Sequence, residues 1–188
     1  MAILYNILWL SSELWKRTLE RKLLNVAIKY NFDVVQIIML WPWIVGARTL
    51  KCAGIPVYVR ASGEDIQINE RIGYGIRRSN QKNQLILDSL KHVSGAVAIS
   101  KTVRSEYISL GMSESDVVVI PPGLDYRRFQ SIQPNLDLSR RGLNIEDGRT
   151  VILGVGRNHP KKRFSQLLQC LKILRTLFAV FIFSYFLQ

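Results

Sequence analysis

The sequence predicts an α/β fold in which short parallel strands alternate with helices. Four short runs of β-branched and aliphatic residues recur along the chain, at 32–40, 56–60, 95–99 and 117–120. Stretches with helical apolar spacing or a helix-capping residue lie between them, which is the order of βαβ units. The first is nearly continuous in apolar residues, as buried parallel strands are. We therefore expect a parallel sheet with flanking helices.

Length and charge limit the classes of protein. The chain has 188 residues, enough for one core or one and a half domains, and its hydrophobic content of 48% excludes general disorder. A net charge of +12 favours anionic partners: nucleotide diphosphates, acidic lipid headgroups or nucleic acid. Cys52 and Cys170 lie far apart, and with His92 and His159 they make no metal-ligand spacing. We expect a reducing, cytoplasmic location and no metal.

The first predicted element is a basic amphipathic helix. Ser11 or Ser12 caps it, Glu13 lies in its first turn, and Asn31 suits a left-handed end. Its apolar stripe comprises Trp15, Leu19, Leu23, Val26, Ala27 and Tyr30, with cations mostly off that stripe. Such a helix either packs on a sheet or rests on an acidic membrane surface.

Residues 33–60 form the clearest βαβ unit. The strand ends at Trp41, Pro42 begins a helix that runs to about Ala53, and Gly54 ends it. The second strand spans Pro56–Arg60, and the crossover should be right-handed.

The turn Ala61–Gln67 follows this second strand at its carboxyl end, where open α/β sheets bind ligands. Its small residues and two carboxylates either line a cleft or form a solvated acidic turn: Ser62, Gly63, Glu64 and Asp65. Residues 69–83 are polar and interrupted by glycines, and we expect a mobile loop before a helix over Gln84–His92. Its cations and one Tyr are also typical of a nucleic-acid contact, but no nucleic-acid-binding motif accompanies them.

The next strands are Gly95–Ile99 and Val117–Ile120. Between them Ser100 caps a helix over Lys101–Leu110, which Gly111 ends. After Pro121 and Pro122, Gly123 is expected to adopt a positive φ, and Asp125 to bond the backbone just after it.

The stretch Val151–Phe164 has a different character. An apolar strand leads to a turn at Gly156, then to four cations, and then to a helix: the cations are Arg157, Lys161, Lys162 and Arg163. The apolar stripe of that helix is Phe164, Leu167, Leu168, Leu171 and Leu174, and residues 177–183 are expected to form the next strand. A strand, a turn, cations and a helix N-terminus can bind phosphate, or can simply form a solvated basic loop.

GRNHPKK resembles the G-R-x(3–4)-K-(K/G) element of the retaining family 4 glycosyltransferases. Those enzymes have two Rossmann-like domains facing each other across a cleft, the GT-B fold. The resemblance implies that Arg157 and Lys162 hold the diphosphate of a nucleotide-sugar donor. The family usually has Gly after this Lys, where this chain has Arg163.

Two further stretches carry the resemblance. AVAIS…LGMSESDVVVIPPGLDYRRF is similar to the family's strand-S-helix-x-G-x(4–6)-strand-P-N-G-V-D-x(3)-F, which implies architectural roles for Ser100, Gly123 and Asp125. RASGEDIQ is similar to strand-x-HGxD at the family's acceptor cleft, with Ser62 where many members have His. This implies that residues 62–65 line the acceptor side.

The resemblance implies a domain plan. Residues 1–125 would form most of the acceptor-side Rossmann-like domain, 126–149 a connection with a short helix near 136–142, and 150–188 the first βα(β) of the donor domain. Relative to the family the chain looks cut at both ends. Met1–Ser12 has no Gly-rich turn, and no glutamate pair follows Arg163.

Three functions are consistent with this sequence. The first is a glycosyltransferase, or a fragment of one, that moves a hexose from a nucleotide-sugar to a glycan or lipid-linked acceptor with retention, without a cofactor. The second is an inactive truncated fragment. The third is a basic protein that binds a membrane surface or nucleic acid. For the first, we expect no nucleic-acid partner and a cytoplasmic location, with peripheral contact at the inner membrane face as an additional expectation.

Overall fold

A computed structural model describes residues 13–130, 150–177 and 180–186. The chain divides into two compact units, residues 1–123 and 124–188.

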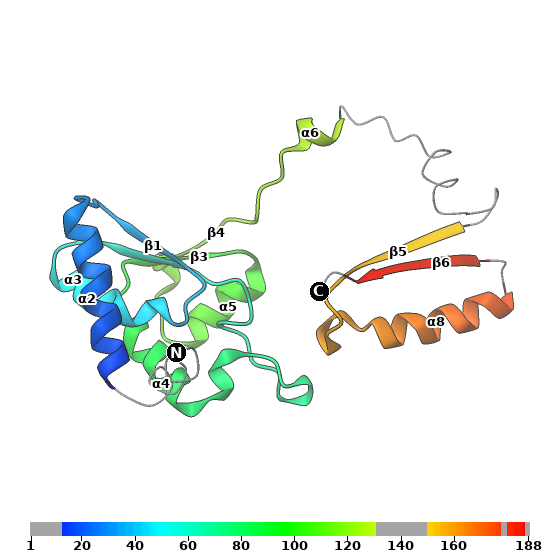
Figure 1. Ribbon diagram of the computed structural model, residues 1–188, viewed down its shortest axis with the longest axis horizontal. Helices are drawn as coiled ribbons and strands as arrows, with labels where there is room; N and C mark the ends of the chain where they lie inside the picture. The colour runs from blue at the N-terminus through cyan, green and yellow to red at the C-terminus, as the bar shows by residue number, and fades with distance from the viewer. Residues whose placement is uncertain (1–12, 131–149, 178–179, 187–188) are drawn as a thin grey trace, which may run out of the picture. The chain divides into compact units, whose positions relative to one another are not determined.

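The first unit contains a parallel sheet of four described strands in the order β1-β2-β3-β4 (Figure 1). The strands are β1 Val35–Ile38, β2 Val57–Arg60, β3 Gly95–Ala98 and β4 Val117–Val119. In the register, Ile37 pairs with Val59, Val59 with Ala96, and Ala96 with Val117. The predicted α/β fold with a parallel sheet is confirmed.

Helices flank this sheet (Figure 1). They are α2 Glu13–Lys29, α3 Ala47–Cys52, α4 Asn80–Leu90 and α5 Lys101–Ser109, with short 3₁₀ turns η1 Trp43–Gly46, η2 Glu70–Ile72, η3 Ile76–Arg78 and η4 Glu114–Asp116. None of these described helices, nor those of the second unit, is long and apolar enough to cross a membrane.

Two helix starts depend on serine caps. The Ser100 hydroxyl accepts the amide of Val103 at 3.3 Å, as predicted. The Ser79 hydroxyl accepts the amide of Lys82 at 3.5 Å, so α4 begins at Asn80 and not at Gln84. The expected mobile loop before α4 therefore contains this cap and two 3₁₀ turns.

The core of the unit lies between the inner strand faces and the helices. Its buried members are mostly aliphatic and include Ile37, Leu40, Ile44, Leu50, Val57, Val59, Ile66, Ile86, Ala96, Ala98, Val103 and Tyr107. Complete burial of one such side chain contributes about 1.5–3 kcal/mol.

The amphipathic helix α2 packs on the protein through a narrower row than predicted. The row has four-residue spacing: Trp15 makes an edge-to-face contact with Trp41 at 5.3 Å, and Leu19 and Ala27 are buried. Val26 and Tyr30 are exposed, since they lie off this row, and Tyr30 follows the last helical residue. Asn31 has the predicted positive φ, at 49°.

The first predicted strand is shorter and more exposed than expected. β1 has only four residues, and Val34 and Ile38 are 52% and 61% exposed. Successive side chains of a strand point to opposite faces of the sheet, so Ile37 lies in the core while Ile38 lies on the other face, which is exposed.

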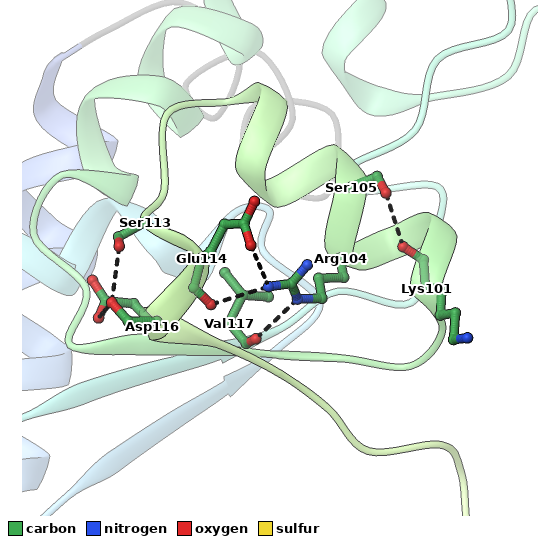
Figure 2. Close-up of polar contacts among 8 residues, drawn as sticks. Lys101, Arg104, Ser105, Ser113, Glu114, Asp116 and Val117 are labelled. Carbon is green, nitrogen blue, oxygen red and sulfur yellow. Dashed lines mark hydrogen bonds and ion pairs between the residues drawn. The ribbon is translucent and has the colours of Figure 1, made fainter.

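A guanidinium joins α5 to the other outer strand of the described sheet (Figure 2). The Nε of Arg104 donates to the carbonyl of Val117 at 3.4 Å, and an η nitrogen donates to the Glu114 carbonyl and carboxylate at 3.3 and 3.2 Å. One side chain thus connects α5, η4 and β4.

The second unit contains α6 Tyr126–Gln130 and a βαβ unit: β5 Thr150–Gly156, α8 Phe164–Leu177 and β6 Val180–Phe186. β5 and β6 are parallel, from Thr150 opposite Val180 to Gly156 opposite Phe186, as the predicted βα(β) requires. The predicted caps Ser11 and Ser12 and the helix near 136–142 lie outside the described residues.

The first turn of α8 packs closely on β5. A Cβ at Gly154 would lie 3.2 Å from the Phe164 ring and 3.6 Å from Leu167, and Leu171 is buried. Leu168 is 55% exposed, so the prediction that it belongs to the packed stripe is wrong. It lies one position beyond Leu167, outside the face that meets the sheet.

Candidate functional site

One carboxylate holds together the loops that follow β1 and β2. Asp65 is fully buried, and its Oδ2 accepts the amide of Leu40 at 2.8 Å. Its Oδ1 accepts the amides of Ser62 and Gly63 at 2.9 and 3.0 Å. The turn at the end of β2 is therefore tied to the loop at the end of β1, at the edge of the sheet where open α/β folds bind ligands.

A buried phenol of α5 also holds the start of this turn. The amide of Ala61 donates to the Tyr107 hydroxyl at 2.8 Å, and Tyr107 is fully buried. Burial raises the pKa of this phenol far above its usual range, although the bond from Ala61 opposes the shift. Tyr107 therefore stays protonated at every physiological pH.

A guanidinium supports the far end of the turn. Arg77 donates to the Ile66 carbonyl at 2.6 Å and to Oδ1 of Asn83 at 2.8 Å, and it lies 3.9 Å from the Glu106 carboxylate. Burial lowers the pKa of Arg77, and the charge of Glu106 offsets part of this effect. These contacts connect the turn to α4 and α5.

The predicted acceptor residues divide into two groups. Ser62 is exposed and Glu64 is half-buried, so their side chains reach the surface at this edge. Gly63 is buried with φ at 120°, and the side chain of Asp65 is fully buried. Asp65 thus acts as an internal hydrogen-bond acceptor and does not line a surface, because three backbone amides surround it. The acceptor role of Ser62 and Glu64 stays a prediction.

The three residues with expected architectural roles, Ser100, Gly123 and Asp125, do not all behave as predicted. Ser100 caps α5 as expected, but Gly123 has no positive φ. Asp125 is exposed, and its carboxylate accepts no hydrogen bond from another described residue. Residues 121–125 have no assigned turn and make no backbone turn bond within the described parts of the chain, so the expected turn at Gly123 is not formed.

The cations of the second unit are placed by a compact loop after β5. The turn η5 Pro160–Lys162 is closed by the Lys162 amide donating to the His159 carbonyl at 2.8 Å, and Nδ1 of His159 accepts the Lys161 amide at 3.1 Å. A Cβ at Gly156 would lie 3.6 Å from both Cδ and Cε of Lys162. The Lys162 side chain therefore folds back over the end of β5, where Arg157 follows directly and is exposed.

A family model described as Glycosyltransferase Family 4 matches residues 3–128, about two thirds of the chain. The chain belongs to Glycosyltransferase Family 4. No curated protein matches it in overall sequence.

Solved structures with GT-B architecture show the same fold. The chain is similar to Anabaena Alr3699/HepE in complex with UDP and glucose, with a TM-score of 0.66 and 18% identity, over 89% of this chain and 42% of that one. A glycosyltransferase from Rickettsia africae ESF-5 gives 0.60 and 15%, over 93% and 52%. UDP-N-acetylglucosamine 2-epimerase from Rickettsia bellii gives 0.53 and 13%, over 95% and 45%. The chain spans about half the length of these structures.

In this family 4 chain, Arg163 has a backbone conformation that is unusual for an arginine. Arg163 has φ at 55° and ψ at 33°, the left-handed region that favours glycine. In this chain the loop needs this conformation to pass from η5 into α8, which suits a glycine better than an arginine. The amide of Leu167 donates to the Arg163 carbonyl at 3.0 Å, so the strained residue starts the helix.

We predict that Arg163→Gly stabilises the start of α8. Removing Cβ relieves about 1–2 kcal/mol of left-handed strain, against about 0.4–1 kcal/mol for the added conformational entropy of the unfolded chain. Native-state hydrogen exchange of the Leu167 amide measures the gain as slower exchange. Arg163→Ala is the control, since it removes the charge and keeps Cβ. Equal protection in both variants contradicts the strain argument.

The sequence did not predict that Tyr107, Arg77 and the amide of Leu40 bind the turn at residues 61–67. A buried Tyr in a helix pattern predicts only core packing, and Arg77 lay in the expected mobile loop. No local signal links either residue to residues 61–66.

Proposed function

We propose that this chain is part of a retaining hexosyltransferase that moves a hexose from a nucleotide-sugar donor to a glycan or lipid-linked acceptor. One observation carries the proposal: in a family 4 chain, Lys162 folds over the carboxyl end of β5, next to Arg157. Related folds in complex with UDP, UDP-glucose and glucose support a nucleotide-sugar as donor.

The two cations have a direct chemical role in this proposal. Breaking the bond between sugar and nucleotide leaves negative charge on the diphosphate. Arg157 offers a planar set of N–H donors, and Lys162 adds a point charge, so both favour the leaving group as its charge develops. No metal or cofactor is assigned to this step.

The acceptor would be held at the carboxyl edge of the first unit's sheet. Ser62 offers a hydroxyl and Glu64 a carboxylate, both suited to bonding sugar hydroxyls. Asp65, Tyr107 and Arg77 would act on the acceptor only indirectly, by fixing the turn. The proposal places the protein in the cytoplasm, with peripheral contact at the inner membrane face.

Titration of the chain with UDP and GDP tests the donor site. We expect at least one nucleotide to bind, and Arg157→Ala and Lys162→Ala each to weaken binding roughly 10–100-fold, since a charge-assisted hydrogen bond contributes about 1.5–3 kcal/mol. Isothermal titration calorimetry measures both affinities.

Lys172→Ala is the matched control for this titration. Lys172 is an exposed cation of the same unit on α8, so its loss changes the charge equally and should leave affinity within about twofold. If neither nucleotide binds, or if Lys172→Ala weakens binding as much as Arg157→Ala, the donor role of these cations is wrong.

A further inference from the structure

A hollow on the first unit lies between α2 and α3. None of its lining residues belongs to the turn at residues 61–67. Its volume is about 560 Å³, within the range of small-molecule sites. It is lined by Lys16, Arg17, Glu20, Leu24, Arg48, Thr49, Cys52 and Ala53.

The lining carries an excess of positive charge. The lining contains three cations, Lys16, Arg17 and Arg48, and one carboxylate, that of Glu20. None of these three cations makes a hydrogen bond or close ion pair through its side chain with another described residue, whereas Arg77, Arg78, Lys91 and Arg104 all have carboxylate partners. Arg17 and Arg48 therefore remain available to an anion from solution, whereas the charge of Lys16 already acts on the Asp88 carboxylate.

Neighbouring residues extend this positive region. The charges of Arg48, Lys51 and Lys91 lower the pKa of His92, after the larger effect of burial, and Asp88 opposes them. Asp88 itself lies 2.9 Å from Lys91. Glu20 is the acidic residue among the described lining. Asp88 is hydrogen-bonded to Lys91 and Gln84, which lower its pKa most, and the charge of Lys16 lowers it further.

Packing between α2 and η1 fixes the shape of the hollow. Gly46 is buried, and a Cβ there would lie 2.5 Å from Cδ1 of Leu23, so the helix approaches the backbone closely. Together with the contact between Trp15 and Trp41, this holds α2 at a set distance from the start of α3. The lining cations project from two helices that core packing positions.

We propose that this hollow binds a phosphate-bearing group, either the headgroup of an anionic lipid or a soluble phosphorylated molecule. Arg17 and Arg48 supply paired N–H donors that match phosphate oxygens, Lys16 adds a third charge, and the Thr49 hydroxyl is a further donor. The site lies wholly within the first unit and does not depend on Arg157 or Lys162.

Two probes identify the source of the phosphate. Pyrophosphate is titrated by calorimetry into the full chain carrying Arg157→Gln/Lys162→Gln, in which the proposed donor site cannot bind the probe. The same chain is co-sedimented with phosphatidylcholine vesicles with and without phosphatidylglycerol. We expect binding to pyrophosphate, to the phosphatidylglycerol vesicles, or to both, and a loss of about tenfold or more in the double variant Arg17→Gln/Arg48→Gln. Binding to vesicles alone assigns a lipid headgroup, and binding to pyrophosphate alone assigns a soluble ligand.

A control variant and the choice of parent chain make the test decisive. Arg71→Gln/Lys101→Gln removes two exposed cations outside the hollow and should keep binding. Using the Arg157→Gln/Lys162→Gln chain as the parent removes the proposed donor site from the measurement, so failure of the donor-site proposal leaves this one standing. The proposal is overturned if neither probe binds this parent chain, or if Arg71→Gln/Lys101→Gln loses as much affinity as Arg17→Gln/Arg48→Gln, because binding then follows total charge.

Discussion

Replacing Asp65 by alanine should destabilise the first unit by about 3–5 kcal/mol, since three amides lose their acceptor and each unsatisfied buried donor costs about 1–3 kcal/mol. These amides belong to Leu40, Ser62 and Gly63, and the carboxylate that accepts them is fully buried. Such a loss is a large part of the total stability of an ordinary domain. The variant should also release the turn after β2 from the loop after β1.

Urea denaturation followed by tryptophan fluorescence measures this change. All four tryptophans precede residue 44, so the signal reports on the first unit. Glu64→Gln is the control: Glu64 is half-buried, and its carbonyl, not its carboxylate, accepts the Ile76 amide at 2.9 Å. The control should lie within about 0.5 kcal/mol of the parent chain. A loss below about 1 kcal/mol for Asp65→Ala contradicts the role assigned to this carboxylate.

Gly75→Ala should have an effect of similar size for a different reason. Gly75 has φ at 111°, and a Cβ there would collide with the Gln67 carbonyl oxygen and lie 3.1 Å from Cα of Ile68. Both neighbours are backbone, so neither can rotate away. Strain of about 1–3 kcal/mol adds to this collision, and we expect a total loss of about 3 kcal/mol or more.

Gly54→Ala separates the two contributions to the loss at Gly75. Gly54 also has a positive φ, at 79°, but a Cβ there would meet nothing within 4 Å. Gly54→Ala should therefore lose only the strain, about 1–2 kcal/mol, in the same urea experiment. Equal losses at the two positions would show that the close approach to Gln67 is not rigid.

The fold was predictable because its signals are local. The strand runs, the Ser100 cap and the left-handed Asn31 depend on neighbouring residues, and the structure contains all of them. The exposure of Ile38 was not predictable, since a nearly continuous apolar run predicts burial on both faces, and tertiary packing decides which face is covered. The early start of α4 was missed although its signal, Ser79, was present.

The candidate site was only partly predictable. The order of Arg157 and Lys162 around a turn was consistent with an anion site or with a solvated basic loop. The loop brings the Lys162 stem back to the strand end, and the anion site stays a prediction. Asp65 was found as part of a polar turn, but its burial was not foreseen. Its acceptor function depends on Leu40, 25 positions away in sequence. Pairings of that kind arise from tertiary structure and leave no local pattern.

The contact of Arg104 with Val117 has a consequence for self-association. β4 and the residue after it are apolar, and Val118, Val119 and Ile120 are 52%, 37% and 50% exposed. An outer strand of this composition is a template on which other chains can add and aggregate. The Arg104 guanidinium occupies one carbonyl of that strand and sets a charge beside it. The bound carbonyl and the charge beside it disfavour the addition of another strand at this position.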